Sequence, residues 1–220
     1  MRADDKQISA LTAGVRLLSE IFWGPSIQRS QAILAGIYFL PFKALESVLT
    51  PDPPDVLHRI ESNLKNFPDA DSLFQYLETE YVRLFVSHRE GIAAPLYESC
   101  YVGTHAGERA PLMGEPAIRM KARLESRGLS VDSNMNEPPD HLAIELEYLY
   151  FLIEKGREDN DPGMIADAAS FAADSMLPWI TGLRERLAAL EAEDNFYLLL
   201  TNVLCAVLQY IGDIQKQLRA

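Results

Sequence analysis

The chain has 220 residues, of which 48% are hydrophobic and 24% charged, and its formal net charge is −12. These proportions are typical of a folded globular protein, and the length suits a single domain. Binding to nucleic-acid phosphates or to an anionic membrane surface needs clustered lysine and arginine, which a net acidic chain disfavours. The two cysteines, Cys100 and Cys205, fit no metal-binding spacing. They are predicted to be two buried thiols in a reducing compartment, and a single long-range disulfide stays open as the alternative.

Neither the N-terminus nor any apolar stretch predicts export or membrane insertion. The first residues carry two aspartates and lead into an amphipathic pattern, which is not a secretory signal. Residues 32–42 are apolar but fall well short of the ~20 residues that a spanning helix needs. Residues 195–212 are long enough, but polar side chains interrupt them, which favours a buried central helix. We therefore expect a cytoplasmic protein.

Helical periodicity dominates the chain from its start, where Ile8, Leu11 and Val15 are spaced by three and four residues. No run alternates apolar and polar residues as a strand would. The expected helices are 8–22, 27–49 with a break at Pro41, 56–64, 71–85, 115–127, 139–155, 161–176, 179–190 and 195–218. Gly24-Pro25, Gly128 and Gly156 are expected helix ends. The predicted fold is all-α, a single compact domain over residues 1–220 with about nine helices.

Residues 87–111 show no sustained period, and glycine and proline recur through them. An unpatterned segment of this length inside a compact domain is uncommon and is usually functional or disordered. Within it, residues 91–101 combine a stiff Pro95, an aromatic Tyr97, an acidic Glu98 and a hydroxyl on Ser99. Two interpretations stay open: a loop whose aromatic residue packs on the protein, or a loop that recognises an apolar, cationic peptide.

The segment 136–152 has the most concentrated polar pattern, with Glu137, His141 and Glu145 four residues apart. If a helix begins by residue 137, these three side chains share one face and could bind a metal or act in acid–base chemistry. Alternatively, Asp140 caps the helix, His141 bonds within a helix junction and Glu145 is partly solvated. No second ligand set, phosphate-binding loop or nucleophile elbow occurs. We expect no metal, no cofactor and no catalysis.

Three segments together resemble the TorD family of cytoplasmic chaperones dedicated to molybdenum-containing reductases. Residues 80–85 read EYVRLF, residues 95–99 read PLYES, and residues 137–142 read EPPDHL with Glu145-Leu146 following. A later family segment usually reads His-Leu-x-x-Trp, whereas this chain has Ser175 in place of the histidine and keeps Trp179. This departure puts in doubt a role for that histidine here.

The resemblance implies an all-α chaperone that binds the twin-arginine signal peptide and the apo form of a molybdopterin-containing reductase of the dimethyl sulfoxide or trimethylamine N-oxide type. It would assist cofactor insertion and delay export until the enzyme is complete. By analogy, the peptide-binding residues are Tyr81, Leu84, Phe85, Pro95, Tyr97, Glu98, Ser99, Pro138, Asp140, His141 and Glu145. Leu84 and Phe85 also lie on an apolar helical stripe, which favours a role in the core.

Two other functions remain open at this point. One is a nitrate-reductase-type assembly factor whose client carries no export signal. The other is a metal-dependent hydrolase that uses Glu137, His141 and Glu145. The segment 156–162 would also permit helix exchange between two copies, and so a homodimer.

Overall fold

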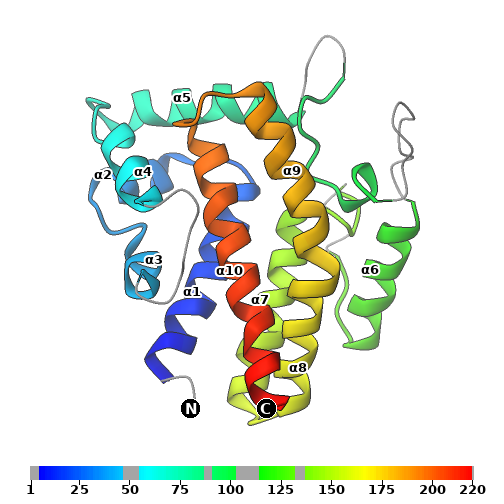
Figure 1. Ribbon diagram of the computed structural model, residues 1–220. Coiled ribbons are helices and arrows are strands. Elements are labelled where there is room, and N and C mark those ends of the chain that lie inside the picture. Colours follow the sequence, from blue (N-terminus) through cyan, green and yellow to red (C-terminus); the bar gives the residue numbers. More distant parts are fainter. Residues whose placement is uncertain (1–4, 47–54, 87–90, 103–113, 132–136, 220) are drawn as a thin grey trace.

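The computed structural model describes residues 5–46, 55–86, 91–102, 114–131 and 137–219. Helices account for almost all of the secondary structure in these ranges, and the one β-type pairing is an isolated bridge (Figure 1). The α-helices are α1 (Asp5–Phe22), α2 (Ile27–Leu34), α3 (Leu40–Leu45), α4 (Val56–Leu64), α5 (Ala70–Tyr81), α6 (Glu115–Ser126), α7 (Leu142–Glu158), α8 (Pro162–Ser170), α9 (Leu177–Leu190) and α10 (Phe196–Arg219).

Three short helical segments complete the set: the π-helical turns η1 (Val82–Val86) and η3 (Phe171–Met176), and the 3₁₀ turn η2 (Glu98–Cys100). Because η3 joins α8 to α9 without interruption, the described residues form nine separate α-helical rods. The prediction of an all-α fold with about nine helices is therefore confirmed.

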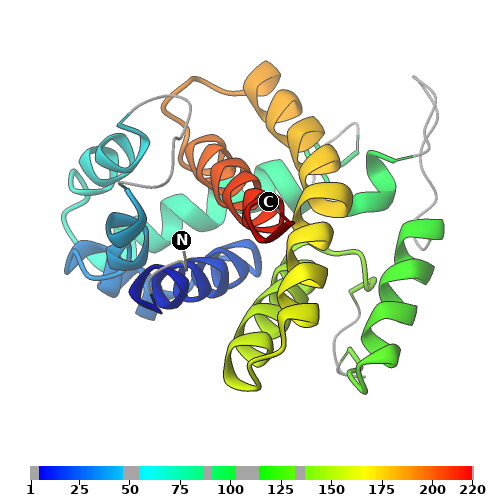
Figure 2. The same cartoon turned by 60° about the horizontal axis from the view of Figure 1, so that its bottom comes forward.

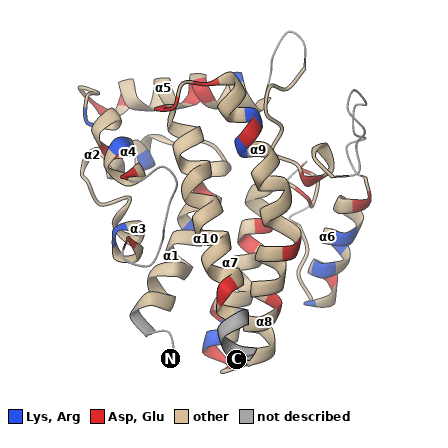
Figure 3. Cartoon of the chain, viewed as in Figure 1, with Lys and Arg blue, Asp and Glu red and all other residues tan. Residues whose placement is uncertain are grey.

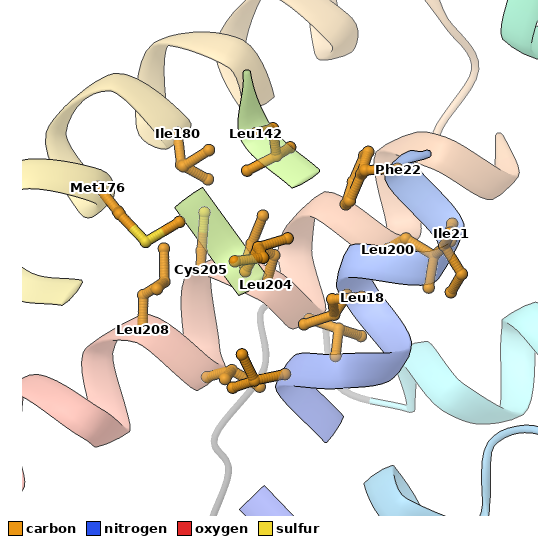
Figure 4. Packing of buried hydrophobic residues seen from close by; sticks show 14 of the residues in the cluster. Leu18, Ile21, Phe22, Leu142, Met176, Ile180, Leu200, Leu204, Cys205 and Leu208 are labelled. Carbon is orange, nitrogen blue, oxygen red and sulfur yellow. The ribbon is translucent and has the colours of Figure 1, made fainter. Parts of the chain in front are cut away.

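The core lies around α10, which runs through the middle of the molecule and packs against α9, α8 and η3 (Figures 1 and 2). Figure 4 shows Leu200, Leu204 and Leu208 of α10 meeting side chains of α1, α7 and α9. The span Phe196–Ile214 is long and apolar enough to cross a membrane, but 72% of its most apolar window is buried inside the protein. A core helix passes the same length test, and the burial matches the expected central helix.

Helix α2 ends earlier than predicted. The sequence indicated a break at Pro41, but α2 stops at Leu34, and Gly36 adopts a φ of +71° in the turn that follows. Pro41 instead lies in the first turn of α3, where its missing N–H has no helical partner to lose. The proline thus starts the second helix after the turn has already broken the first.

The predicted end of a helix at Met176 is wrong. The chain continues from α8 through η3 into α9, with Pro178 in the first turn of α9. Within an α-helix the ring of Pro178 would clash with the carbonyl of Asp174. The wider π-helical turn directly before Pro178 relieves that conflict, so the rod continues.

Gly156 does not end α7, which runs on to Glu158. A Cβ at Gly156 would lie 2.8 Å from the Cδ1 of Ile165 and 3.1 Å from the Cβ of Met164, so the close approach of α8 favours glycine there. The expected end at Gly128 is confirmed, since α6 stops at Ser126 and Gly128 has a φ of +71°.

Both cysteines are free thiols, as predicted. Cys205 is buried in α10, whereas Cys100 is only partly buried at the end of η2. Part of the predicted loop 87–111 lies outside the described residues. Its described portion, 91–102, contains η2 and leads to the junction described next.

Candidate functional site

The loop 91–102 is joined to the start of α7 by its backbone. Tyr97 and His141 form an isolated antiparallel bridge. On one side the N–H of Glu98 donates to the carbonyl of Asp140 at 3.0 Å, and on the other the N–H of Leu142 donates to the carbonyl of Leu96 at 2.8 Å. Two segments singled out separately in the sequence thus meet at one junction, which brings together most of the predicted site residues.

Asp140 ties this junction together and does not cap the helix. Its side chain is fully buried, and its Oδ2 accepts a hydrogen bond from the backbone N–H of Ser99 at 2.9 Å. The interpretation of Asp140 as a helix cap is wrong, because the cap is His141, whose Nδ1 accepts from the N–H of Ala143 at 3.2 Å. The Oδ1 of Asp140 has no donor among the described residues.

His141 is held between two aromatic rings as a neutral imidazole. Trp23 stacks on it with ring centroids 5.1 Å apart, and Tyr97 meets it edge-on at 5.2 Å. Burial lowers the pKa of His141 to about 4, although the nearby charges of Glu137 and Asp140 act in the opposite direction. Since Nδ1 accepts from the backbone of Ala143, the ring proton is on Nε2 at neutral pH.

A chain of buried acidic groups runs inward from η2. The guanidinium of Arg119 donates to the Oε1 of Glu98 at 2.9 Å, and the indole N–H of Trp179 donates to the Oε2 of Glu145 at 3.1 Å. Burial first, and then the charge of Glu98, raise the pKa of Glu145 well above its usual value. Burial thus favours the neutral form of Glu145, and the interpretation of Glu145 as partly solvated is wrong.

The outer side of the junction is an aromatic and acidic surface. The indole N–H of Trp23 donates to Glu147 at 2.6 Å, and the Tyr97 hydroxyl donates to Glu137 at 2.6 Å. Burial, followed by this bond to Glu137, raises the pKa of Tyr97. Both carboxylates accept these hydrogen bonds from neutral donors. We call Trp23, Tyr97, Glu137, Pro138 and Glu147 the aromatic–acidic face.

The three predicted residues from 81–85 lie behind this surface. Leu84 and Phe85 are buried in the core, with 0% and 4% of their surface exposed, in agreement with the apolar helical stripe. Tyr81 is partly buried, and its hydroxyl donates to the carbonyl of Phe22 at 2.9 Å. The ring of Tyr81 also lies 3.6 Å from the position of a Cβ on Gly24, whose φ is +115°. These residues position the end of α1, and thereby Trp23.

Pro95 is also buried, and its carbonyl accepts a hydrogen bond from the Tyr101 hydroxyl at 2.9 Å. Pro95, Glu98, Ser99, Asp140, His141 and Glu145 therefore lie beneath the surface, while Tyr97, Pro138 and, in part, Tyr81 reach it.

The shared face proposed for Glu137, His141 and Glu145 does not exist, because α7 begins only at Leu142 and Glu137 precedes it. Among the described residues no group of three His, Cys, Asp or Glu side chains is arranged to hold a metal ion.

Sequence reasoning missed Trp23 and Glu147. Trp23 directly follows α1 and precedes Gly24-Pro25. A residue at a helix end attracts no attention when the sequence is searched only for apolar helical spacing. Ser175, which replaces the family histidine, accepts a hydrogen bond from Arg123 of α6 at 2.9 Å. This contact gives the serine a definite place in the structure.

The sequence profile of the nitrate reductase delta subunit family matches residues 52–185. This range includes the whole junction and every residue of the aromatic–acidic face except Trp23. The chain belongs to this family. TorD chaperones are among its relatives: the one from Vibrio cholerae is 29% identical over 144 residues, covering 63% of this chain and 61% of that protein. TorD from Photobacterium profundum is 28% identical over 162 residues, 72% of this chain and 71% of its own length. The family predicted from the three segments is confirmed.

The fold of this chain also agrees with that of a solved structure. The crystal structure described as a redox enzyme maturation protein from Archaeoglobus fulgidus superposes with a TM-score of 0.53. The superposition covers 95% of this chain and 96% of that one at 19% sequence identity, so it bears on the fold alone. The alignment to the Vibrio cholerae chaperone covers less than two thirds of its length.

Proposed function

We propose that this protein is a cytoplasmic chaperone that binds the twin-arginine signal peptide and the apo form of a molybdopterin-containing reductase. It acts by binding and not by turnover, and it delays export until the cofactor is inserted. The observation that carries the proposal is the aromatic–acidic face, of which Tyr97, Glu137 and Pro138 belong to the two family segments 95–99 and 137–142. The TorD names of the relatives support a client of the trimethylamine N-oxide or dimethyl sulfoxide reductase type.

The chemistry of this face suits a pair of arginines. Glu137 and Glu147 are carboxylates bonded to neutral donors, so each can accept charge-assisted hydrogen bonds from a guanidinium group. The rings of Trp23 and Tyr97 beside them offer surfaces on which a guanidinium stacks. The net charge of −12 favours the approach of a cationic segment.

The apolar part of a signal peptide would meet exposed apolar side chains at η1. Val82 and Val86 of η1 leave 42% and 52% of their surface exposed, next to the partly buried Tyr81. Apolar side chains exposed beside a polar rim are typical of a peptide-binding surface. In this proposal the buried residues of the predicted set, above all Asp140 and His141, hold the side chains of the aromatic–acidic face in position.

Calorimetric titration with a synthetic twin-arginine signal peptide tests the proposal. We expect the double variant Glu137→Gln/Glu147→Gln to bind at least about tenfold more weakly, a loss of about 1.4 kcal/mol, because two charged acceptors become neutral. Glu158→Gln, an exposed carboxylate at the far end of α7, is the matched control and should bind as the wild type does. A peptide with both arginines replaced by alanine should not bind.

The support residues are tested with Asp140→Ala/His141→Ala. If the face depends on them, this variant loses peptide affinity while its helical circular dichroism persists. Equal affinity of the wild type for the arginine and alanine peptides would refute signal-peptide recognition.

The second candidate is a nitrate-reductase-type assembly factor for a reductase without an export signal. The description of the matching family as nitrate reductase delta subunits favours it. Its distinguishing result is stable capture of a co-expressed apo-reductase that lacks a signal peptide, together with no binding of the isolated peptide. The predicted homodimer by helix exchange around 156–162 remains a prediction that gel filtration with light scattering can measure.

A further inference from the structure

Helix α6 lies at one edge of the molecule, and basic residues occur along it (Figures 2 and 3). Arg119 and Arg123 of α6 and Arg127, the residue directly after its end, are spaced by four residues and so share one face. Arg123 donates to Ser175 and Arg127 pairs with Asp167. Arg123 also lines a pocket of about 320 Å³ together with residues of α7, α8 and η3.

Arg119 differs from the other two because its partner is buried. The side chain of Glu98 is 4% exposed, whereas that of Asp167, the partner of Arg127, is 56% exposed. Only one nitrogen of Arg119 contacts Glu98, at 2.9 Å, while the other terminal nitrogen contacts the exposed Glu115 at 3.2 Å. The pair is therefore a single-point contact and not the two-point arrangement that guanidinium and carboxylate groups can form.

Behind Glu98 stand two further carboxyl groups with unused hydrogen-bonding capacity. Glu145 and Asp140 are 1% and 0% exposed, and an oxygen of each has no donor among the described residues. The buried hydroxyl of Ser99 also has no hydrogen-bond partner among the described residues. These buried carboxyl groups therefore have few hydrogen-bond donors, and Arg119 is the cation that contacts Glu98.

We propose that Glu98, backed by Glu145 and Asp140, is a receptor for one guanidinium group, and that Arg119 occupies it until an arginine of the bound client peptide displaces it. The second half of this statement rests on the proposed function. The receptor itself does not.

The exchange is physically inexpensive in this geometry. The Arg119 side chain is 42% exposed, so it can turn toward water without leaving a buried charge unpaired. Helix α6 stays in place meanwhile, because Met120 and Leu124 remain buried against the core. A client guanidinium that approaches with both terminal nitrogens would make two hydrogen bonds where Arg119 makes one.

Chemical rescue tests the receptor without any peptide. Arg119→Ala removes the cation, leaves Glu98 unpaired and should lower the thermal midpoint. Low-millimolar guanidinium chloride should then raise that midpoint more than sodium chloride of equal ionic strength does. Arg127→Ala, which removes the same charge from the same helix, is the matched control and should show no such difference. If both variants respond alike, or neither responds, the receptor is refuted. Arg119→Gln replaces the first variant should it fail to fold.

The displacement is tested with the arginine-bearing signal peptide. Because the competitor is gone, Arg119→Ala should bind the peptide about fivefold more tightly than the wild type, while Arg127→Ala should match the wild type. Unchanged or weaker binding to Arg119→Ala, with the wild type binding normally, refutes displacement and leaves the proposed function intact. No binding by the wild type refutes the proposed function, and guanidinium rescue still decides the receptor.

Discussion

Replacing Glu145 with glutamine tests whether the buried side chain of Glu145 is neutral in the folded protein. Glu145 is 1% exposed, and its Oε2 accepts from the indole N–H of Trp179 at 3.1 Å. Glutamine has nearly the same shape, keeps a carbonyl oxygen for Trp179 and offers an N–H₂ group to Glu98. The substitution therefore preserves the hydrogen bonds of the protonated acid while removing its titration.

The size of the effect follows from the raised pKa of Glu145. An acid whose pKa is higher in the folded state binds a proton on folding, so its stabilising contribution is complete below the unfolded-state value of 4.5. That contribution is lost as pH rises toward the folded-state pKa, at up to about 1.4 kcal/mol of unfolding free energy per pH unit. Glu145→Gln lacks this loss. Its stability relative to the wild type should therefore increase with pH at up to that rate.

Urea unfolding at a series of pH values from about 5 to about 8 measures this difference. Titrations common to both proteins cancel in the comparison. Glu147→Gln, two residues along α7 and exposed, is the control and should differ from the wild type by a constant amount. A Glu145→Gln difference that does not change with pH would show that Glu145 is ionised in the folded protein.

Two further predictions concern packing and the aromatic stack. Gly212→Ala would place a Cβ 2.8 Å from that of Ala173. Overpacking of about 1–3 kcal/mol should outweigh the gain in helix propensity of about 1 kcal/mol, so urea unfolding should show a less stable protein. Adding Ala173→Gly removes the clashing Cβ, so the double variant should lose little further stability. In Trp179→Phe, the emission of the remaining Trp23 should fall as pH drops through about 4, where His141 becomes charged. A fluorescence midpoint near the ordinary histidine pKa of 6.5 would contradict the buried, neutral ring.

The helices could be predicted from sequence because their apolar spacing is strong, but several boundaries could not. Pro178 indicates a helix break because a proline ring clashes with the preceding turn, yet the π-helical turn before it lets the rod continue. No sequence feature of residues 171–176 predicts that turn. Gly156 resembles a helix end for the same reason that Gly128 is one. Only the approach of Ile165 from another helix distinguishes them.

The sequence predicted which segments form the candidate site, but not how deeply their side chains are buried. A sequence shows that Asp140 and Glu98 are acidic; it does not show that the bridge between Tyr97 and His141 draws both beneath the surface. The surface residues come from contacts distant in sequence. Trp23 and Glu147 are 124 positions apart, and no local pattern links them.

The π-helical turn η3 also indicates how the continuous helix from α8 to α9 arose. A π-helical turn corresponds to one residue inserted into an α-helix. Since each residue of an α-helix turns by about 100°, deleting one residue from Phe171–Met176 would rotate every side chain of α9 by that angle relative to α8. Trp179 would then leave Glu145, and the acid would lose its indole donor. A single codon gained or lost in this turn therefore determines whether the C-terminal half of the rod contributes to the buried acidic chain.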